Sequence, residues 1–220
     1  IVRRGVVAVP DGISFDRACF VEPVNTCWKA VVKCEIQAGD AVVVLGQGPI
    51  GLLFTMLLVR QGAVVYATDP LEGRRALARR FGARAVFDPA DGEALAATLA
   101  VATESRGADA VVVATAARGI AQQAVDLSRP GARILLFAQT APEPVELDGA
   151  AVCVGERAVL GCYSADIDLQ EESARLVLDG ELPVEDLISH RLPLDQIHAG
   201  IDMATHPGSE TLKIVVHPQK

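Results

Sequence analysis

A glycine-rich turn between a strand and a helix is the feature that most constrains the fold of this chain. The hexapeptide GQGPIG (46–51) directly follows the apolar run 41–45 and opens a stretch with helical character. Gly46 permits a tight turn, Gly48 lets a pyrophosphate approach the backbone, and Gly51 lets the helix pack closely on the strand. The helix N-terminus would face the phosphates with free N–H groups. The motif therefore predicts a dinucleotide-binding turn.

Asp69 supports this interpretation because it follows the next apolar run, 63–68, and lies 18 residues beyond Gly51. A carboxylate at that spacing can accept hydrogen bonds from the adenosine ribose hydroxyls and repel a 2′-phosphate. The spacing therefore favours NAD over NADP. Two alternatives remain: Asp69 and Pro70 form only a turn, or the fold binds another ligand such as S-adenosylmethionine.

Short apolar runs alternate with helical stretches from about residue 40 to residue 162. Several runs are nearly continuous in Val, Ile and Leu, which is typical of strands buried on both faces. The pattern predicts an α/β fold of the Rossmann type, with a doubly wound, parallel, six-stranded sheet between helices. The expected strands are 41–45, 63–68, 84–87, 109–114, 132–138 and 157–161, and the expected helices are 50–61, 71–81, 92–105, 118–128 and 146–154.

The two ends of the chain have a different pattern. Residues 6–9 predict a strand, and Pro23 opens a predicted helix over 23–34. The tail is expected to form a helix at 167–179, an extended segment at 189–194, a helix at 194–204 and a strand at 212–217. We therefore expect the domains to divide the chain into 1–22, 23–165 and 166–220.

Composition and charge exclude several classes of protein. With 20 basic and 28 acidic residues the net charge is −8, so we expect no nucleic-acid partner. The five cysteines include no CxxC pair, which argues against a disulfide framework and favours a reducing cytoplasm. The uncharged stretch 41–59 is long enough to span a membrane, but glycines and a proline interrupt it. With no secretory leader present, we expect a cytoplasmic protein without a membrane partner.

Taken together, the motifs resemble the medium-chain dehydrogenase/reductase family of zinc-type alcohol dehydrogenases, especially its sorbitol- and threonine-dehydrogenase-like branch. The matching segments are VPDGISFDRACFVEPVNTCWKAV (9–31), GDAVVVLGQGPIGLL (39–53), ATDPLEGRRALARRFGA (67–83), GCYSAD (161–166), LISHRLPLDQIHAGI (187–201) and ETLKIVVHP (210–218). The resemblance implies the C-terminal, cofactor-binding half, with remnants of the GroES-like catalytic domain at both ends. Strand 6–9, segment 189–193 and strand 212–217 would be those remnants, paired as a small sheet.

The resemblance also implies roles for individual residues. Asp69 and Arg74 would hold the adenosine ribose, whereas the run of arginines on helix 71–81 otherwise predicts a solvated face. The other implied cofactor contacts are Gly46, Gly48, Pro49, Ile50 and Gly51 in the pyrophosphate turn, Thr115 after the fourth strand, and Phe137 and Ala138 beside the nicotinamide. The family usually has a glycine after the position of Thr115, where this chain has Ala116.

Glu22 is the candidate metal ligand. In the polyol dehydrogenases the matching glutamate lies at the catalytic zinc, and a carboxylate oxygen is a legitimate zinc ligand. Alternatively, an acid before Pro23 stabilises the start of a helix. The family's other zinc ligands, a cysteine and a His-Glu pair, and its proton relay would precede Ile1. The histidines are expected at the surface or in packing: His190, His198, His206 and His217.

These features predict an NAD-dependent oxidoreductase in which a zinc-polarised alcohol or polyol passes hydride to NAD⁺. Because the other zinc ligands are missing, we expect no catalytic residue in this chain and no activity from it alone. The alternative is a non-catalytic dinucleotide-binding module, either a natural truncation or a redox sensor. Pairing of the edge strand 157–161 with its twin would give a homodimer or homotetramer.

Overall fold

The computed structural model describes residues 5–138 and 144–218. The chain divides into two compact units. The first, which we call the terminal unit, consists of Ile1–Asn25 and Ala165–Lys220. The second, which we call the central unit, is Thr26–Ser164. Helix α2 (Val21–Lys33) contains the boundary between them.

A parallel sheet, which we call the main sheet, forms the middle of the central unit. Within the described residues it has six strands in the order β3-β2-β1-β4-β5-β6, so the predicted Rossmann-like α/β fold is confirmed. The strands are β1 Ala41–Leu45, β2 Val64–Thr68, β3 Ala85–Phe87, β4 Ala108–Val113, β5 Ser128–Leu136 and β6 Ala158–Gly161. The order reverses between β1 and β4, which is where a doubly wound sheet binds its ligands.

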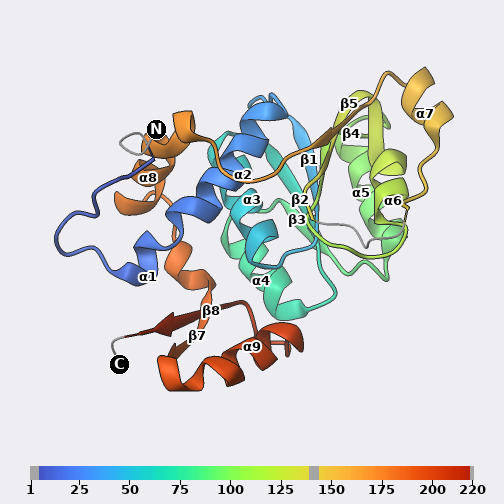
Figure 1. Cartoon of the computed structure of the whole chain (residues 1–220). Helices are drawn as coiled ribbons and strands as arrows, with labels where there is room; N and C mark the ends of the chain where they lie inside the picture. The colour runs from blue at the N-terminus through green and yellow to red at the C-terminus, as the bar shows by residue number, and fades with distance from the viewer. Residues whose placement is uncertain (1–4, 139–143, 219–220) are drawn as a thin grey trace. The chain divides into compact units, whose positions relative to one another are not determined.

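Helices cover both faces of the main sheet. Figure 1 shows α3 and α4 on one face and α5 and α6 on the other, as right-handed crossovers require. The helices are α3 Pro49–Arg60, α4 Glu72–Arg80, α5 Gly92–Ala102, α6 Ile120–Leu127 and α7 Gly149–Val154.

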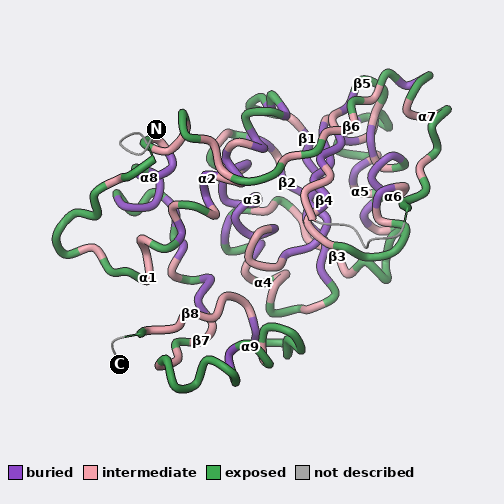
Figure 2. Tube along the Cα trace, in the orientation of Figure 1, coloured by how far each residue is buried: buried purple, intermediate pink, exposed green. Residues whose placement is uncertain are grey.

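The core of the central unit follows the two strands at the middle of the main sheet. Every residue of β1 is buried, as are all but one of β4 (Figure 2). On one face, Val43 and Val111 pack with Leu95 and Leu99 of α5. Burial on both faces explains why these strands are continuous runs of apolar residues rather than alternating ones.

The terminal unit combines helices with a small parallel sheet. Its elements are α1 Phe15–Ala18, α8 Gln170–Leu178, α9 Ile197–Thr205, β7 Ile188–Pro193 and β8 Lys213–His217, with 3₁₀ turns at Ile167–Leu169, Val184–Leu187 and Leu194–Gln196. The fully buried Asn25 ties its two segments together. The Asn25 amide donates to the carbonyl of Asp166 at 2.9 Å and to the side chain of Gln170 at 2.7 Å.

Many of the expected boundaries shift by a few residues, and three of the differences have a clear physical reason. The predicted strand over 6–9 is wrong: Val6 and Val9 are exposed, and these residues pair with neither β7 nor β8. Helix α2 begins at Val21 rather than Pro23, because a proline in the first turn lacks only an N–H that has no helical partner there. Strand β5 begins at Ser128, four residues before the expected start, where its pairing with β4 is irregular.

In the ranges 5–138 and 144–218, no helix is both long enough and apolar enough to cross a membrane. The uncharged stretch 41–59 instead forms β1, the glycine turn and most of α3.

Candidate functional site

The candidate site lies at the carboxyl edge of the main sheet. Leu45 of β1 pairs with Thr68 of β2 on one side and with Val113 of β4 on the other. The chain therefore leaves these strands at one level, with Gly46 and Asp69 as the first residues beyond β1 and β2. This edge, at the reversal of strand order, is where such sheets bind dinucleotides.

Two glycines of the turn after β1 have no room for a side chain. Gly46 has a φ of +93°, and a Cβ there would lie 3.0 Å from the Cβ of Thr115. A Cβ on Gly51 would lie 1.9 Å from the carbonyl oxygen of Gly46. At Gly48, the nearest protein atom to such a Cβ is Nη1 of Arg74 at 3.9 Å. Gly46 and Gly51 thus shape the turn, whereas Gly48 leaves space beside it.

Helix α3 begins directly after this turn, so its N-terminus lies at the edge of the sheet. Gly48 is its N-cap and supplies no side-chain acceptor, and Pro49 follows as the first helical residue. The Leu52 N–H donates to the carbonyl of Gly48 at 2.9 Å. The amides of Ile50 and Gly51 precede that bond and belong to the first turn, whose N–H groups have no intrahelical acceptor. An anion at this position would accept hydrogen bonds from them.

The carboxylate of Asp69 is 3% exposed and is held in place by backbone groups. Its Oδ2 accepts the N–H of Gln47 at 2.8 Å, and its Oδ1 accepts the N–H of Leu71 at 2.9 Å. Nη1 of Arg74 lies 3.7 Å from Oδ2. Each carboxylate oxygen has about two acceptor positions, so Asp69 keeps acceptor capacity beyond these two hydrogen bonds.

Two buried polar residues that were not predicted from the sequence, Gln47 and Thr55, support the turn. Both are fully buried: the Gln47 amide donates to the carbonyl of Gly46 at 3.0 Å, and the Thr55 hydroxyl donates to Oε1 of Gln47 at 2.8 Å. The pair thereby fixes the turn to α3. Gln47 occupies a variable position of the motif, and the available sequence signal is a lone threonine within the apolar helix.

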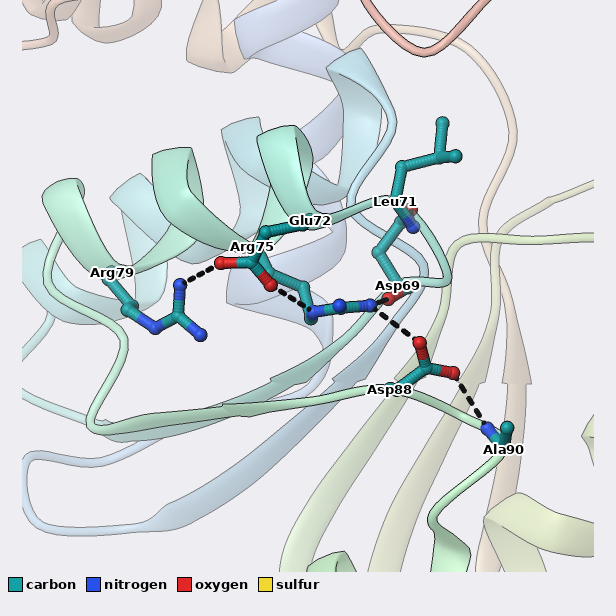
Figure 3. A network of polar contacts seen from close by, with 7 residues as sticks. All are labelled: Asp69, Leu71, Glu72, Arg75, Arg79, Asp88 and Ala90. Atoms are coloured by element: carbon teal, nitrogen blue, oxygen red, sulfur yellow. Dashed lines mark hydrogen bonds and ion pairs between the residues drawn. The ribbon is translucent and has the colours of Figure 1, made fainter.

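A second polar network joins the ends of β2 and β3 to α4 (Figure 3). Nη1 of Arg75 donates to the backbone carbonyl of Asp69 at 2.6 Å and to Oδ2 of Asp88 at 2.9 Å. Nε of Arg75 donates to Oε2 of Glu72 at 2.9 Å. Burial opposes the charge of Arg75, but the hydrogen bonds and charges of Glu72 and Asp88 outweigh it and raise the pKa of Arg75.

The expected solvated face of the α4 arginines is therefore only partly correct. Arg79 and Arg80 are exposed, whereas Arg74 and Arg75 are largely covered, with side chains 18% and 13% exposed. Hydrogen bonds from Arg79 and then Arg75 lower the pKa of Glu72. The four arginines thus divide between a surface pair and a pair beside Asp69.

The remaining candidate cofactor residues lie on the other side of β1 from Asp69. Thr115 packs against Gly46 in the segment after β4. The amides of Phe137 and Ala138, after β5, both donate to the carbonyl of Val113, at 3.2 and 3.0 Å. The ring of Phe137 meets that of Phe54 edge to face, with centroids 4.8 Å apart.

A cavity of about 630 Å³ opens next to this side of the site. It is lined by Ala116–Ile120, Gln122 and Pro144–Asp148. Its volume falls within the range of small-molecule sites. This cavity was not predictable from the sequence, because two loops that are distant in the sequence form it.

Glu22 is exposed in the first turn of α2. Nowhere in the described part of the chain do three or more His, Cys, Asp or Glu side chains gather into a group that could hold a metal ion. The described residues therefore do not provide a zinc site of their own.

Comparisons with known proteins agree with this geometry. Residues 49–179 match the family described as zinc-binding dehydrogenase. The chain is 28% identical to (R,R)-butanediol dehydrogenase of Neisseria gonorrhoeae over 99% of its own length and 61% of the relative's. The crystal structure of 2R,3R-butanediol dehydrogenase from Bacillus subtilis superimposes with a TM-score of 0.85 at 26% identity, covering 96% of this chain and 60% of that one.

A putative zinc-binding dehydrogenase from Sinorhizobium meliloti, crystallised with NADP, is 28% identical to this chain. Its structure gives a TM-score of 0.86 and covers 96% of this chain and 61% of its own. The chain thus spans about 60% of the length of the relatives that it matches.

Proposed function

This chain belongs to the zinc-binding dehydrogenase family, and from that premise we propose that the carboxyl edge of its main sheet binds NAD(H). The observation that carries the proposal is the buried carboxylate of Asp69, fixed beside the glycine turn by the N–H of Gln47. A carboxylate there accepts the ribose hydroxyls and repels the 2′-phosphate of NADP(H). The Sinorhizobium meliloti relative was crystallised with NADP, so the preference needs its own test.

The proposed cofactor lies across the reversal of strand order, from β2 to β5. Its adenosine ribose contacts Asp69 and Arg74, and its pyrophosphate lies over Gly48 at the N-terminus of α3. The other proposed contacts are Gly46, Pro49, Ile50 and Gly51 in the turn, and Thr115, Phe137 and Ala138 on the nicotinamide side. The cavity beside Thr115 supports this direction, because it lies on the β4 and β5 side of the edge.

We further propose that the protein to which this chain contributes oxidises a small alcohol or polyol. The names of the relatives, among them a butanediol dehydrogenase, support this substrate class. Zinc would polarise the alcohol in that protein. Glu22 is the proposed contribution of this chain to the zinc site, and the other ligands would come from outside the described residues. The 220-residue chain would then bind cofactor without turning over substrate.

The remaining proposals concern the protein's surroundings. None of the five cysteines, all of which lie in the described residues, forms a disulfide bond, which favours a reducing compartment such as the cytoplasm. The net charge of −8 disfavours nucleic-acid partners. The edge strand β6 would pair with that of a second copy to give a homodimer, or a homotetramer built from such dimers.

The test is calorimetric titration of the chain with NADH and NADPH. We expect NADH to bind at least roughly tenfold more tightly, given the single carboxylate that distinguishes the two, and Asp69→Ala to lose that discrimination. Asp11→Ala, a change at an exposed loop position, is the matched control and should leave both affinities unchanged. Equal affinity of the unaltered chain for both cofactors would contradict the proposal.

A turnover assay separates an enzyme from a cofactor-binding module. We expect no reduction of NAD⁺ by the 220-residue chain with zinc and 2,3-butanediol, and zinc-dependent reduction when the chain is part of a complete dehydrogenase. A complete protein that binds NAD(H) but never reduces NAD⁺ would favour the non-catalytic module.

A further inference from the structure

Asp88 lies beside Asp69 at the carboxyl edge of the main sheet. β2 and β3 are parallel neighbours in which Thr68 pairs with Phe87, so Asp69 and Asp88 are the next residues of the two strands. The N–H of Asp69 donates to the carbonyl of Phe87 at 3.2 Å. Because neighbouring strands lie about 4.8 Å apart, the two acids leave the sheet next to each other.

Arg75 connects these two acids through one nitrogen. Its Nη1 reaches the carbonyl oxygen of Asp69 at 2.6 Å and the carboxylate of Asp88 at 2.9 Å (Figure 3). Its Nε is hydrogen-bonded to Glu72, and its side chain is 13% exposed. Arg75 is therefore held among protein groups and is poorly placed to serve as the cation for a ligand phosphate.

Asp88 is held in place but remains accessible. Its Oδ1 accepts the N–H of Ala90 at 2.9 Å while Oδ2 accepts Arg75, and the side chain is 42% exposed. A carboxylate with both oxygens fixed and an open side keeps its negative charge at one position on the edge.

We infer that Asp88 is a second specificity-determining residue against NADP(H), and that Arg75 is the positioning residue that holds Asp88 and the backbone of Asp69 in register. The inference rests on the proposed binding of the adenosine ribose at Asp69. A 2′-phosphate carries roughly −1.5 to −2 charge near pH 7. Bound at a ribose beside Asp69, it would also approach Asp88 at the end of the neighbouring strand. Asp88 adds a second repulsion, and it also keeps Arg75 from turning towards the phosphate.

The test measures the dissociation constants of NADH and NADPH for Asp88→Asn. We expect NADPH to bind roughly threefold to tenfold more tightly than to the unaltered chain, as for one charge removed at partly screened range, with NADH within about twofold. The gain should shrink as salt is raised, because the interaction is electrostatic. A purely structural role for Asp88 would not produce a salt-dependent change in the ratio.

Glu72→Gln is the matched control. It removes the other carboxylate partner of Arg75, but Glu72 belongs to α4 and its side chain is 62% exposed. We expect an unchanged ratio, because Asp69 and Asp88 still hold Arg75. Arg75→Met should weaken NADH binding, and Arg75→Lys should recover part of the loss.

Four outcomes would overturn the inference or the proposed function on which it rests. An NADPH affinity unaltered in Asp88→Asn, or the same gain in Glu72→Gln, overturns the inference while leaving the NAD(H) site in place. No binding of either cofactor by the unaltered chain refutes the proposed function itself. If Asp88→Asn does not fold, Asp88→Ser provides the same test, and a gain in NADPH affinity that does not change with salt would overturn the inference.

Discussion

The carboxylate of Asp69 accepts the backbone N–H of Gln47 at 2.8 Å, so the acid that follows β2 also fixes the glycine turn that follows β1. Two parts of the proposed cofactor site are therefore coupled before any ligand is present. A change at either residue is expected to affect both ribose and pyrophosphate binding.

Replacing Gly48 by alanine should separate ligand binding from folding. An added Cβ meets no protein atom closer than 3.9 Å, and the Gly48 φ of −65° suits alanine. We expect the unfolding free energy to stay within about 1 kcal/mol of the unaltered value, while NADH affinity falls at least roughly tenfold because the methyl group occupies the pyrophosphate approach. Urea unfolding and calorimetry check the two expectations.

Gly51→Ala is the contrasting variant. Its Cβ would lie 1.9 Å from the carbonyl oxygen of Gly46, so the turn itself must move. We expect a loss of stability as well as of binding. If Gly48→Ala binds NADH normally, the pyrophosphate does not pass over Gly48.

Thr55→Val should lower the stability of the fold, because it leaves a buried polar group without its hydrogen-bond donor. The change removes the hydroxyl that donates to Oε1 of Gln47 and leaves that oxygen buried without this donor. We expect the free energy of unfolding to fall by about 1–3 kcal/mol. We also expect the affinity for NADH to fall more than the affinity for adenosine, because adenosine lacks the pyrophosphate that lies over the turn. Thr55→Ser keeps the hydroxyl and should restore the relative affinity. Equal stability of the two variants would show that the hydrogen bond contributes little.

Asp109 should make the stability depend on pH at the opposite, amino edge of the main sheet. Its Oδ2 accepts the N–H of Ala41 at 2.8 Å, and its Oδ1 accepts Nε of Arg129 at 2.6 Å. Burial pushes the pKa of Asp109 upwards, but Arg129 and the Ala41 N–H outweigh it and hold the pKa below its usual range.

A folded-state pKa below the unfolded one stabilises the fold above the unfolded pKa, about 3.9 for aspartate. That contribution disappears as the pH falls through the folded-state pKa. Asp109→Asn should therefore lose about 1–3 kcal/mol at pH 7 and show a shallower decline towards pH 3. Urea titrations across this range measure both, with the exposed Asp126→Asn as control. Parallel pH profiles for Asp109→Asn and the unaltered chain would contradict the assignment.

Val159→Pro should weaken the proposed dimer. Val159 lies in the edge strand β6, where proline removes a backbone donor and disfavours strand pairing. We expect light scattering to show dissociation at concentrations where the unaltered chain is dimeric. Val159→Thr keeps the N–H and should stay dimeric. An unchanged dimer in Val159→Pro would place the contact elsewhere.

The main sheet was largely predictable because each buried parallel strand is a local run of apolar residues. β1 matches its expected range, and the starts of β2 and β3 shift by one residue. The wrong strand at 6–9 shows the limit of this signal, since apolar valines form a strand only where another strand offers hydrogen-bond partners.

The glycine turn and Asp69 were predictable for the same reason: their spacing in the sequence reflects strand-to-helix geometry. The contacts that support them were not. Arg75 was expected on a solvated face but is covered. Its partners lie in different elements: Glu72 on α4, Asp69 after β2 and Asp88 after β3. Charge patterning along one helix carries no information about acids on neighbouring strands.

The buried Gln47 side chain has a further consequence for the course of binding. The Gln47 amide donates a hydrogen bond to Gly46, and its Oε1 accepts one from Thr55, so the turn is preorganised in the absence of ligand. The entropy of ordering the loop is then lost on folding, and little remains to be lost when the dinucleotide arrives. The association rate constants of NADH and NADPH at such a rigid site should be similar. Discrimination between the two cofactors should therefore lie mainly in their dissociation rate constants.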